Sequence, residues 1–495
     1  MSNENDNDID LIEYIDSYEQ PHNLQELLEY AREKPIAVWN DNTNVLTYVA
    51  SFDIEKFPED NRNSMCLIFH GGGIVLQVVG RTREAVIDAA LFFLRLEQPS
   101  KETDNWLEIN AHSCHSFDFR GTGTQWIERL FEISPARHVK FEHLVLSVEQ
   151  SLILATRTQP IGLSFASSSL DDYGDAFVDA LAGRQSSFGS LTLDGTPALV
   201  NDNVERLLQV DCLDHLDLPF YFEDDRALLP FSAKVNSLSY ILFTDDISVA
   251  DIQSLNIVAN KLALRIVHDG ESFPTKFMIA FWERVLRLGH FVELRVVLTF
   301  GDEDNGLNRS LMPVPNSVVA AIVHAIKANA NLEVLDLSSS DKVLDWDPHV
   351  GSLLYYLEDL KALRTFRIDV ADEDEAFGYA YGNLQYFLCR NRTCRVTNND
   401  GDAYTDDWMI DRMYKFNRFY QGVTGLVSQP HSERSVLVAE ALTKRARLKF
   451  KHCALLLSSH LDLLNEIVQA TQLDDIADDD SLSSLNQDQK RQRIL

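Results

Sequence analysis

One short string in this sequence has the residue types of an esterase active site. In His70-Gly-Gly-Gly73, consecutive glycine amides follow a histidine and can form an oxyanion hole, as they do in some esterases. Such an enzyme also needs a serine on a strained G-x-S-x-G turn, and the nearest string, Gly162-Leu-Ser-Phe-Ala166, lacks the second glycine. Glycines between two β-rich runs are also typical of a hairpin turn, because glycine adopts positive φ without strain. We therefore expect a turn at residues 70–73, with a serine esterase-like hydrolase as the alternative.

Two other clusters contain residue types that bind metal ions. His112, Cys114 and His115 lie close in sequence, but structural zinc needs four ligands, and no second pair follows at a suitable spacing. Asn398-Asn-Asp-Gly401 is similar to part of a calcium loop, yet it places Val396 at the first ligand position, where an oxygen is required. No nucleophile, base and orienting acid combine elsewhere. The sequence therefore predicts a protein that is not an enzyme and that needs no metal and no other cofactor.

The overall charge of the chain argues against two classes of binding partner. The chain has 495 residues, with 44 Lys and Arg against 76 Asp and Glu, which gives a formal net charge of −32. A surface this acidic repels nucleic-acid backbones and anionic membranes, so we expect neither as a partner. Hydrophobic residues make up 45% and charged residues 24%, which is typical of a globular protein with several domains.

Two features indicate the compartment. No segment reaches the ~18 consecutive apolar residues of a membrane span, and the acidic N-terminus lacks the basic-then-apolar order of a secretion signal. The six cysteines form no C-x-x-C pair and are typical of reduced thiols. We expect a cytoplasmic protein, with the nucleus as the alternative.

The first part of the chain predicts a small α+β unit. Residues 1–20 are rich in Asp, Asn and Glu and are expected to be disordered. The α+β unit spans 21–105. It combines a helix over 24–32, β-rich runs at 36–39, 45–52, 65–70 and 74–79, and a helix over 82–96.

Residues 106–400 contain an irregular internal repeat, which is the strongest indication of the fold. The repeat has the order apolar-x-x-apolar-x-apolar, followed by a helical stretch, and seven of the ten sites have all three apolar positions. The first and last repeats lie 250 residues apart over nine intervals, so the mean period is near 28 residues. The second apolar position falls at Leu144, Leu163, Leu191, Leu216, Leu238, Leu264, Leu294, Leu335, Phe366 and Cys394.

One of these repeats resembles a known family. The stretch Val318–Leu337, VVAAIVHAIKANANLEVLDL, is similar to the leucine-rich repeat of the ribonuclease-inhibitor type. The resemblance implies an α/β solenoid in which each repeat gives one strand to a parallel inner sheet and one helix to the outer surface. The family places Asn or Cys three residues after the last strand leucine. Only Asn399 conforms here, so we expect loose, irregular repeats.

After residue 400 the strand pattern ends. Residues 401–472 predict a C-terminal helical cap, with helices over 408–420 and 435–469, that covers the last repeat. Residues 473–495 are expected to form a disordered tail. Within the cap, Lys444–His452 is a basic amphipathic segment that predicts either a site for an acidic partner or an internal counter-charge. We favour the counter-charge, because Leu448 and Phe450 are expected to pack.

The repeat geometry predicts one binding surface. The apolar residues of each strand point to the core, so the residue between them points to the concave face. In the first five repeats this residue is small or acidic, whereas four of the last five are arginine. Such a column attracts carboxylates or phosphates, but Glu293, Asp336 and Asp369 lie beside it and can instead pair with the arginines. The candidate residues for partner binding are Arg265, Arg295, Asp336, Arg367 and Arg395.

The function predicted from these features is that of a non-catalytic protein–protein interaction scaffold. The leucine-rich-repeat solenoid would bind a protein partner, in particular an acidic segment, on its concave face. One version is a substrate-selecting adaptor of a ubiquitin ligase, although the sequence contains no ligase-docking motif that we recognise.

Overall fold

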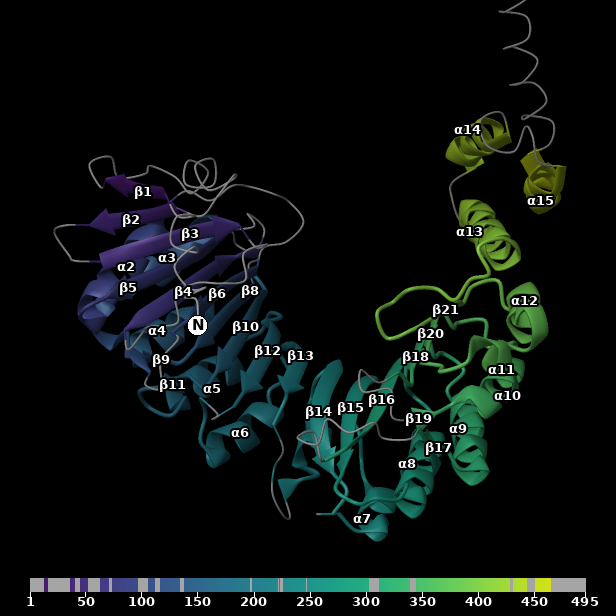
Figure 1. Ribbon diagram of the computed structural model, residues 1–495, viewed down its shortest axis with the longest axis horizontal. Coiled ribbons are helices and arrows are strands. Elements are labelled where there is room, and N and C mark those ends of the chain that lie inside the picture. Colours follow the sequence, from purple (N-terminus) through teal and green to yellow (C-terminus); the bar gives the residue numbers. More distant parts are fainter. Residues whose placement is uncertain are drawn as a thin grey trace, which may run out of the picture. The chain divides into compact units, whose positions relative to one another are not determined.

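The chain forms two compact units, which are described separately (Figure 1). Unit 1 consists of Met1–Arg284 and His290–Gly306, and unit 2 of Val285–Gly289 and Leu307–Leu495. The division lies inside the segment 106–400, which the sequence analysis treated as one region. The computed structural model describes residues 13–16, 36–40, 45–51, 63–70, 74–96, 106–111, 116–133, 138–195, 198–220, 222, 226–245, 247–301, 311–338, 344–427, 431–442 and 450–463.

Unit 1 begins with antiparallel strands, as the predicted α+β region implies. Strand β3 (Val45–Ser51) pairs with β2 (Ile36–Asn40) and with β5 (Ile74–Gly80), and β4 (Ser64–Phe69) pairs with β5 and with β6 (Trp106–Asn110). Phe69 lies opposite Ile74, which confirms that residues 70–73 connect a hairpin. Strand β1 (Glu13–Asp16) runs parallel to β2, so the prediction of disorder is wrong for these four residues. The predicted helix over 24–32 lies outside the described residues.

From β6 onward, the sheet of unit 1 is parallel. In the described part of this unit thirteen strands form one sheet, in the order β1-β2-β3-β5-β4-β6-β8-β10-β12-β13-β14-β15-β16. The change from antiparallel to parallel pairing occurs at β6, close to residue 105, where the α+β region was predicted to end. The parallel strands are β8 (His138–Glu142), β10 (Ile161–Ala166), β12 (Gly189–Asp194), β13 (Leu213–Leu218), β14 (Ser237–Phe243), β15 (Lys261–His268) and β16 (Glu293–Phe300).

Helices alternate with these strands and lie on one side of the sheet (Figure 1). Parallel neighbours need such crossover connections, because a strand cannot return in the same direction through a short turn. Side chains on the helix side are fully buried, among them Leu163, Leu191 and Leu216. An α/β fold with a long, mostly parallel sheet is thereby confirmed. The helices are α2 (Arg83–Arg95), α3 (Gln125–Ile133), α4 (Val148–Thr156), α5 (Asp175–Ala182), α6 (Asn201–Leu208), α7 (Val249–Ser254) and α8 (Thr275–Leu288), which continues into unit 2.

Capping side chains define where several helices start. Ser147 accepts a hydrogen bond from the backbone of Gln150, whose side chain in turn accepts one from the backbone of Ser147. Ser248 and Asp251 form the same reciprocal arrangement at the start of α7. Each pair satisfies amides that a helix leaves without internal partners, which is why these short helices begin where they do.

Unit 2 repeats the alternation of strand and helix on a smaller scale. Strands β18 (Val334–Asp336), β20 (Thr365–Arg367) and β21 (Arg395–Thr397) are parallel neighbours. Two-residue strands β17 (Met312–Pro313) and β19 (Leu344–Asp345) pair separately. The helices are α9 (Asn316–Ala328), α10 (Asp347–Leu357), α11 (Glu373–Phe377) and α12 (Gly382–Arg390).

Three helices follow the last strand, as predicted for the end of the chain. They are α13 (Met409–Val427), α14 (His431–Ala441) and α15 (Phe450–Ser459), so two helices occur where one was predicted over 435–469. Their shared core contains Val423, Val438, Leu456 and Leu463. Phe450 is 86% exposed, so its predicted packing role is wrong. Residues 443–449, which carry most of the basic segment, and the tail 473–495 lie outside the described residues.

Hydropathy gives one further finding. Among the helices of the described residues, none is both long and apolar enough to cross a bilayer.

Candidate functional site

The register of neighbouring strands decides which side chains share the face of the unit 1 sheet opposite the helices, which we call the open face. In the central strands the predicted register is confirmed, because Leu163, Leu191, Leu216 and Leu238 lie side by side. On the open face, the residues that come directly after these leucines also lie side by side. This row continues through β15 to β16. It contains Ser164, Thr192, Asp217, Ser239, Ala263 and Arg295.

Arg265 does not belong to this row. It lies opposite Ile241 of β14 and Val297 of β16, two residues further along the strand than Ala263, which is the neighbour of Arg295. The prediction of a straight arginine column is therefore wrong between β15 and β16. Leu262 and Leu264 both face the core, and a shift of two residues leaves the alternation of buried side chains unchanged, so the sequence pattern could not detect it.

Two further positions of the predicted column are corrected. In unit 2, Arg367 lies opposite Thr397, while Arg395 lies opposite Thr365, because Val396 rather than Cys394 is the neighbour of Phe366. In unit 1, Leu144 belongs to β9 (Leu144–Leu146), which pairs with β7 (Phe117–Asp118) and β11 (Ser169–Leu170) in a separate three-stranded sheet. The residue that actually adjoins Ser164 in the row is Lys140 of β8.

In unit 2 the internal-pairing interpretation is correct for one of the candidate arginines. Asp336 and Arg367 lie opposite each other, with 3.5 Å between a guanidinium nitrogen and a carboxylate oxygen. Asp336 is almost fully buried, and its other oxygen accepts hydrogen bonds from the amide and hydroxyl of Ser338. Its carboxylate thus already has partners within the chain, so we assign Asp336 and Arg367 a structural role.

In unit 1, strands β15 and β16 bring Arg265 and Arg295 onto the open face. Both side chains are exposed, and the register neighbours of Arg265, Ile241 and Val297, carry no charge. Lys261 and Glu293, which lie opposite each other at the strand starts, form an ion pair of 2.5 Å. Arg265 forms no ion pair with any described residue. Three cations, Lys261, Arg265 and Arg295, thus lie on this part of the face, in a chain whose net charge is −32.

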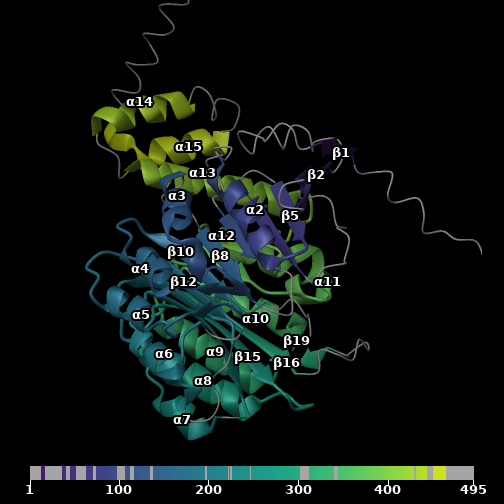
Figure 2. The same ribbon diagram turned by 90° about the vertical axis from the view of Figure 1, so that its left-hand side faces the viewer.

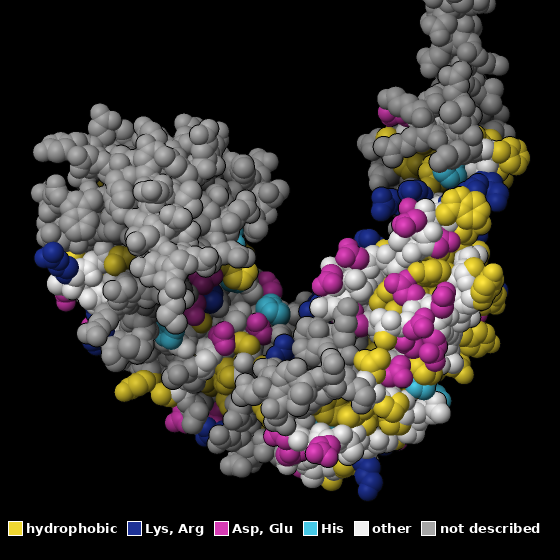
Figure 3. Space-filling view, viewed as in Figure 1, with side chains coloured by type: hydrophobic (Ala, Val, Ile, Leu, Met, Phe, Trp, Pro, Cys, Tyr) yellow, Lys and Arg dark blue, Asp and Glu magenta, His cyan; other side chains and the backbone are white. Residues whose placement is uncertain are grey.

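Part of the surface of unit 2 carries the opposite charge. In Figure 3, acidic side chains gather over the helices of unit 2, where α11 has Glu373, Asp374 and Glu375 in its first turn. The cations of β15 and β16 contrast with this acidic surface.

At its other end, the open face carries aromatic and imidazole rings that the sequence analysis did not single out. The ring of His138 stacks on Trp106 at 4.0 Å between centroids, and Trp106 is 38% exposed. The His138 ring also covers Gly162 of the next strand, where any larger residue would overlap it. His215 hydrogen bonds through Nδ1 to the hydroxyl of Ser237, 2.9 Å away. Gly162 within an otherwise regular strand was the only signal of this contact in the sequence.

These histidines make the stability of unit 1 depend on pH. Burial lowers the pKa of both His138 and His215, and the charge of His215 lowers that of His138 further. Unfolded histidine takes up a proton near pH 6.5, whereas these folded side chains do so only at lower pH. Their contribution to stability is therefore complete above about pH 6.5 and is lost as the pH falls.

We expect the urea midpoint of unit 1 to fall between pH 7.5 and 5.5, and to fall less in the His138→Gln/His215→Gln variant. Exposed His324 of α9 gives a matched control, since His324→Gln should leave the pH dependence as it is. Tryptophan fluorescence during urea unfolding measures the midpoint, because Trp106 stacks on His138. An equal pH dependence in the double variant and the parent would contradict the assignment.

Among the residues that the structure describes, the catalytic candidates do not assemble into a site. Ser164 lies within the regular strand β10 rather than on a strained turn. Thr244 and Asp245 both approach Nδ1 of His268, at 2.6 and 3.6 Å, so His268 does not link them as a catalytic relay would. The described residues contain no cluster of three or more His, Cys, Asp or Glu side chains suited to a metal ion. The predicted candidates His112, Cys114 and His115 lie outside the described residues.

Comparison with known proteins adds no functional information. The chain matches no protein-family model. A search of curated proteins likewise finds no significant match. Arguments about function therefore rest on the site itself.

Proposed function

We propose that this protein is a non-catalytic interaction protein, and that an acidic segment of a protein partner binds to the open face of unit 1 beside Arg265 and Arg295. In this proposal the alternating strands and helices are degenerate leucine-rich repeats of a solenoid, and the open face is its concave surface. The parallel sheet and the one-sided helices support this interpretation, since such folds use the uncovered face of the sheet for binding.

The observation that carries the proposal is the exposure of Arg265, whose register neighbours Ile241 and Val297 are uncharged and which forms no ion pair with any described residue. Exposed Arg295 lies on the same face of the next strand. A guanidinium group binds a carboxylate through parallel hydrogen bonds, and it loses less hydration energy on binding than an ammonium group does. Half-buried Ile241 and Val297 lie directly beside Arg265 and offer apolar contact to the same ligand. A segment that alternates acidic and apolar side chains fits this arrangement best.

Charge reversal at both arginines tests the proposal. The full-length protein is immobilised, and proteins captured from cell lysate are quantified by mass spectrometry for the parent and for Arg265→Glu/Arg295→Glu. Affinity for the specific partner should fall by roughly 10²-fold, because each reversal replaces an attraction with a repulsion. The captured partner is then titrated as a purified protein at two salt concentrations, and its affinity should weaken as salt rises.

A matched control is available on the same unit. Lys234 and Lys276 are exposed and lie outside the sheet strands, so Lys234→Glu/Lys276→Glu changes the net charge equally without touching the open face. Equal capture by both double variants would show that only net charge matters and would reject the site. Capture unaffected by Arg265→Glu/Arg295→Glu would reject it as well.

A further inference from the structure

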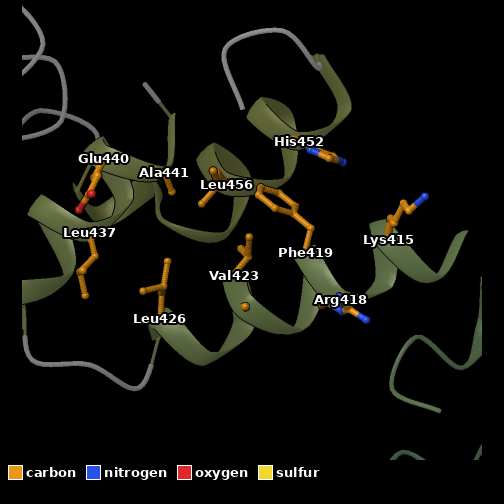
Figure 4. Close-up of a pocket in the computed structure, with 11 residues that line it drawn as sticks. Lys415, Arg418, Phe419, Val423, Leu426, Leu437, Glu440, Ala441, His452 and Leu456 are labelled. Carbon is orange, nitrogen blue, oxygen red and sulfur yellow. The ribbon is translucent and has the colours of Figure 1, made fainter. Parts of the chain in front are cut away.

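The helices α13, α14 and α15 line a cavity of about 790 Å³ that is open to solvent on one side (Figure 4). It lies within unit 2 and is separate from the open face discussed above. Cavities of roughly 300–1,000 Å³ are typical of small-molecule sites. We call it the cap cavity.

The floor of the cap cavity is a single apolar face of α13. Phe419, Val423 and Leu426 follow one another at helical spacing and line it. Leu437 and Ala441 of α14 and Leu456 of α15 complete the apolar lining. An apolar chain laid along this floor would be covered by side chains from three helices.

Charge is distributed unequally along the cavity. Figure 4 shows Lys415, Arg418 and His452 at one end, and Leu437 and Glu440 at the other. Arg418 is exposed and forms no ion pair with any described residue. Lys415 lies 3.3 Å from Asp411, but the lysine is 75% exposed, and exposed pairs of this kind contribute little. One end of the cap cavity is therefore cationic and the other anionic.

One residue of α13 that lines the cavity, Gly422, has no side chain. Gly422 lies in the interior of α13, where glycine is unfavourable compared with alanine. A side chain at this position would meet no neighbouring atom within 4 Å, so packing within the described structure does not require glycine. Because Gly422 lines the cavity, its missing side chain leaves room for a ligand.

We propose that the cap cavity binds a single-chain carboxylate amphiphile, that is, a fatty acid or a molecule of that chemistry. The carboxylate lies between Lys415 and Arg418, and the alkyl chain runs over Phe419, Gly422 and Val423 toward Leu426. The cationic end selects an anionic head group, and the apolar floor selects a tail without polar groups. Glu440 at the far end disfavours a ligand that carries a second carboxylate there.

Titration of the full-length protein with dodecanoate, below its micelle concentration, tests the proposal by calorimetry. We expect saturable binding of one molecule. Decanoate should bind about tenfold more weakly, because it buries two fewer methylene groups. Dodecyltrimethylammonium, which has the same tail and the opposite charge, and dodecanedioate, which places a carboxylate near Glu440, should bind at least tenfold more weakly than dodecanoate.

Two substitutions on α13 locate the ligand. Gly422→Leu fills the cavity and should abolish dodecanoate binding, while it favours the helix. Gly425→Leu is the matched control: a side chain there also meets no atom within 4 Å, and Gly425 does not line the cavity. This variant should bind normally. Lys415→Glu/Arg418→Glu should remove the preference for dodecanoate over dodecyltrimethylammonium.

Three results would overturn the proposal. The first is the absence of dodecanoate binding, and the second is equal binding of the cationic and anionic amphiphiles. The third is dodecanoate binding that Gly422→Leu leaves intact, because the ligand would then occupy another place. The first result overturns the proposal even where the protein binds anionic vesicles. None of these results depends on the open face, so they leave the proposed function unaffected.

Discussion

Replacing Asn391 with alanine should lower the unfolding free energy of unit 2 by about 3–5 kcal/mol. Asn391 is fully buried after the last turn of α12. Its amide nitrogen donates hydrogen bonds to the carbonyls of Leu357 and Leu360, at 3.2 and 2.9 Å. Its amide oxygen accepts from the backbone nitrogens of Thr393 and Cys394, both at 3.1 Å, and from the Thr393 hydroxyl.

The magnitude follows from what the substitution leaves behind. Each buried polar group that loses its partner costs about 1–3 kcal/mol, and Asn391→Ala leaves carbonyls and amides unpaired without admitting an apolar replacement. Water entering the space offsets part of this cost. The side chain joins the end of α10 to the entry of β21, so its loss affects two consecutive helix–strand segments.

Urea unfolding together with hydrogen exchange tests this prediction. The Thr393 and Cys394 amides should exchange faster in Asn391→Ala than in the parent. Asn398→Ala is the control: Asn398 accepts one exposed hydrogen bond from Asp402, so its loss should cost about 1 kcal/mol or less. A similar cost at both positions would show that burial of the Asn391 network does not matter.

Replacing Gly189 with alanine should have an effect of similar size in unit 1. Gly189 starts β12 with φ of +103°, a conformation that residues with a side chain rarely adopt. A methyl group there would also overlap the backbone carbonyl of Ile161 on the neighbouring strand β10. Backbone strain of roughly 1–3 kcal/mol combines with this overlap, so we expect a total loss of about 3–4 kcal/mol.

The control for this prediction lies six residues earlier. Gly183 follows α5 with φ of −81°, and a methyl group there would make only ordinary contacts, at 3.7 Å. Gly183→Ala should therefore change stability by less than about 1 kcal/mol. Urea unfolding monitored through far-UV circular dichroism compares it with Gly189→Ala. Equal midpoints for the two variants would contradict the argument.

Asn391 also shows why sequence reasoning found some structural residues and missed others. We looked for capping asparagines three residues after the strand, as in the family that the repeat resembles. In unit 2 they lie instead at helix ends: Asn391 follows α12, and Asn329 follows α9, where its amide donates to carbonyls of Ala325 and Val285. An asparagine after a helix is common, and only the position of the preceding helix reveals what its side chain reaches.

In the candidate site, too, the sequence predicted some features of single residues correctly and missed others. Alternation in KLALRIVH predicts correctly that Arg265 points away from the core, because neighbouring side chains of a strand point to opposite faces. Alternation does not tell which residue of the next strand lies opposite. Asp336 and Arg367 were expected to be neighbours and are, whereas Arg265 and Arg295 are offset by two residues.

Sequence by itself determined the class of fold, the change from hairpins to parallel strands near residue 105, and which face of each strand carries charge. These are local properties, since hydrophobic periodicity and turn residues act over a few neighbouring positions. Tertiary structure decided the register of β15 against β16, the partners of Asp336 and Asn391, and the cavity beside Gly422. Each of these depends on segments about 30 residues apart in the chain that meet only when backbone hydrogen bonds and packed side chains align them.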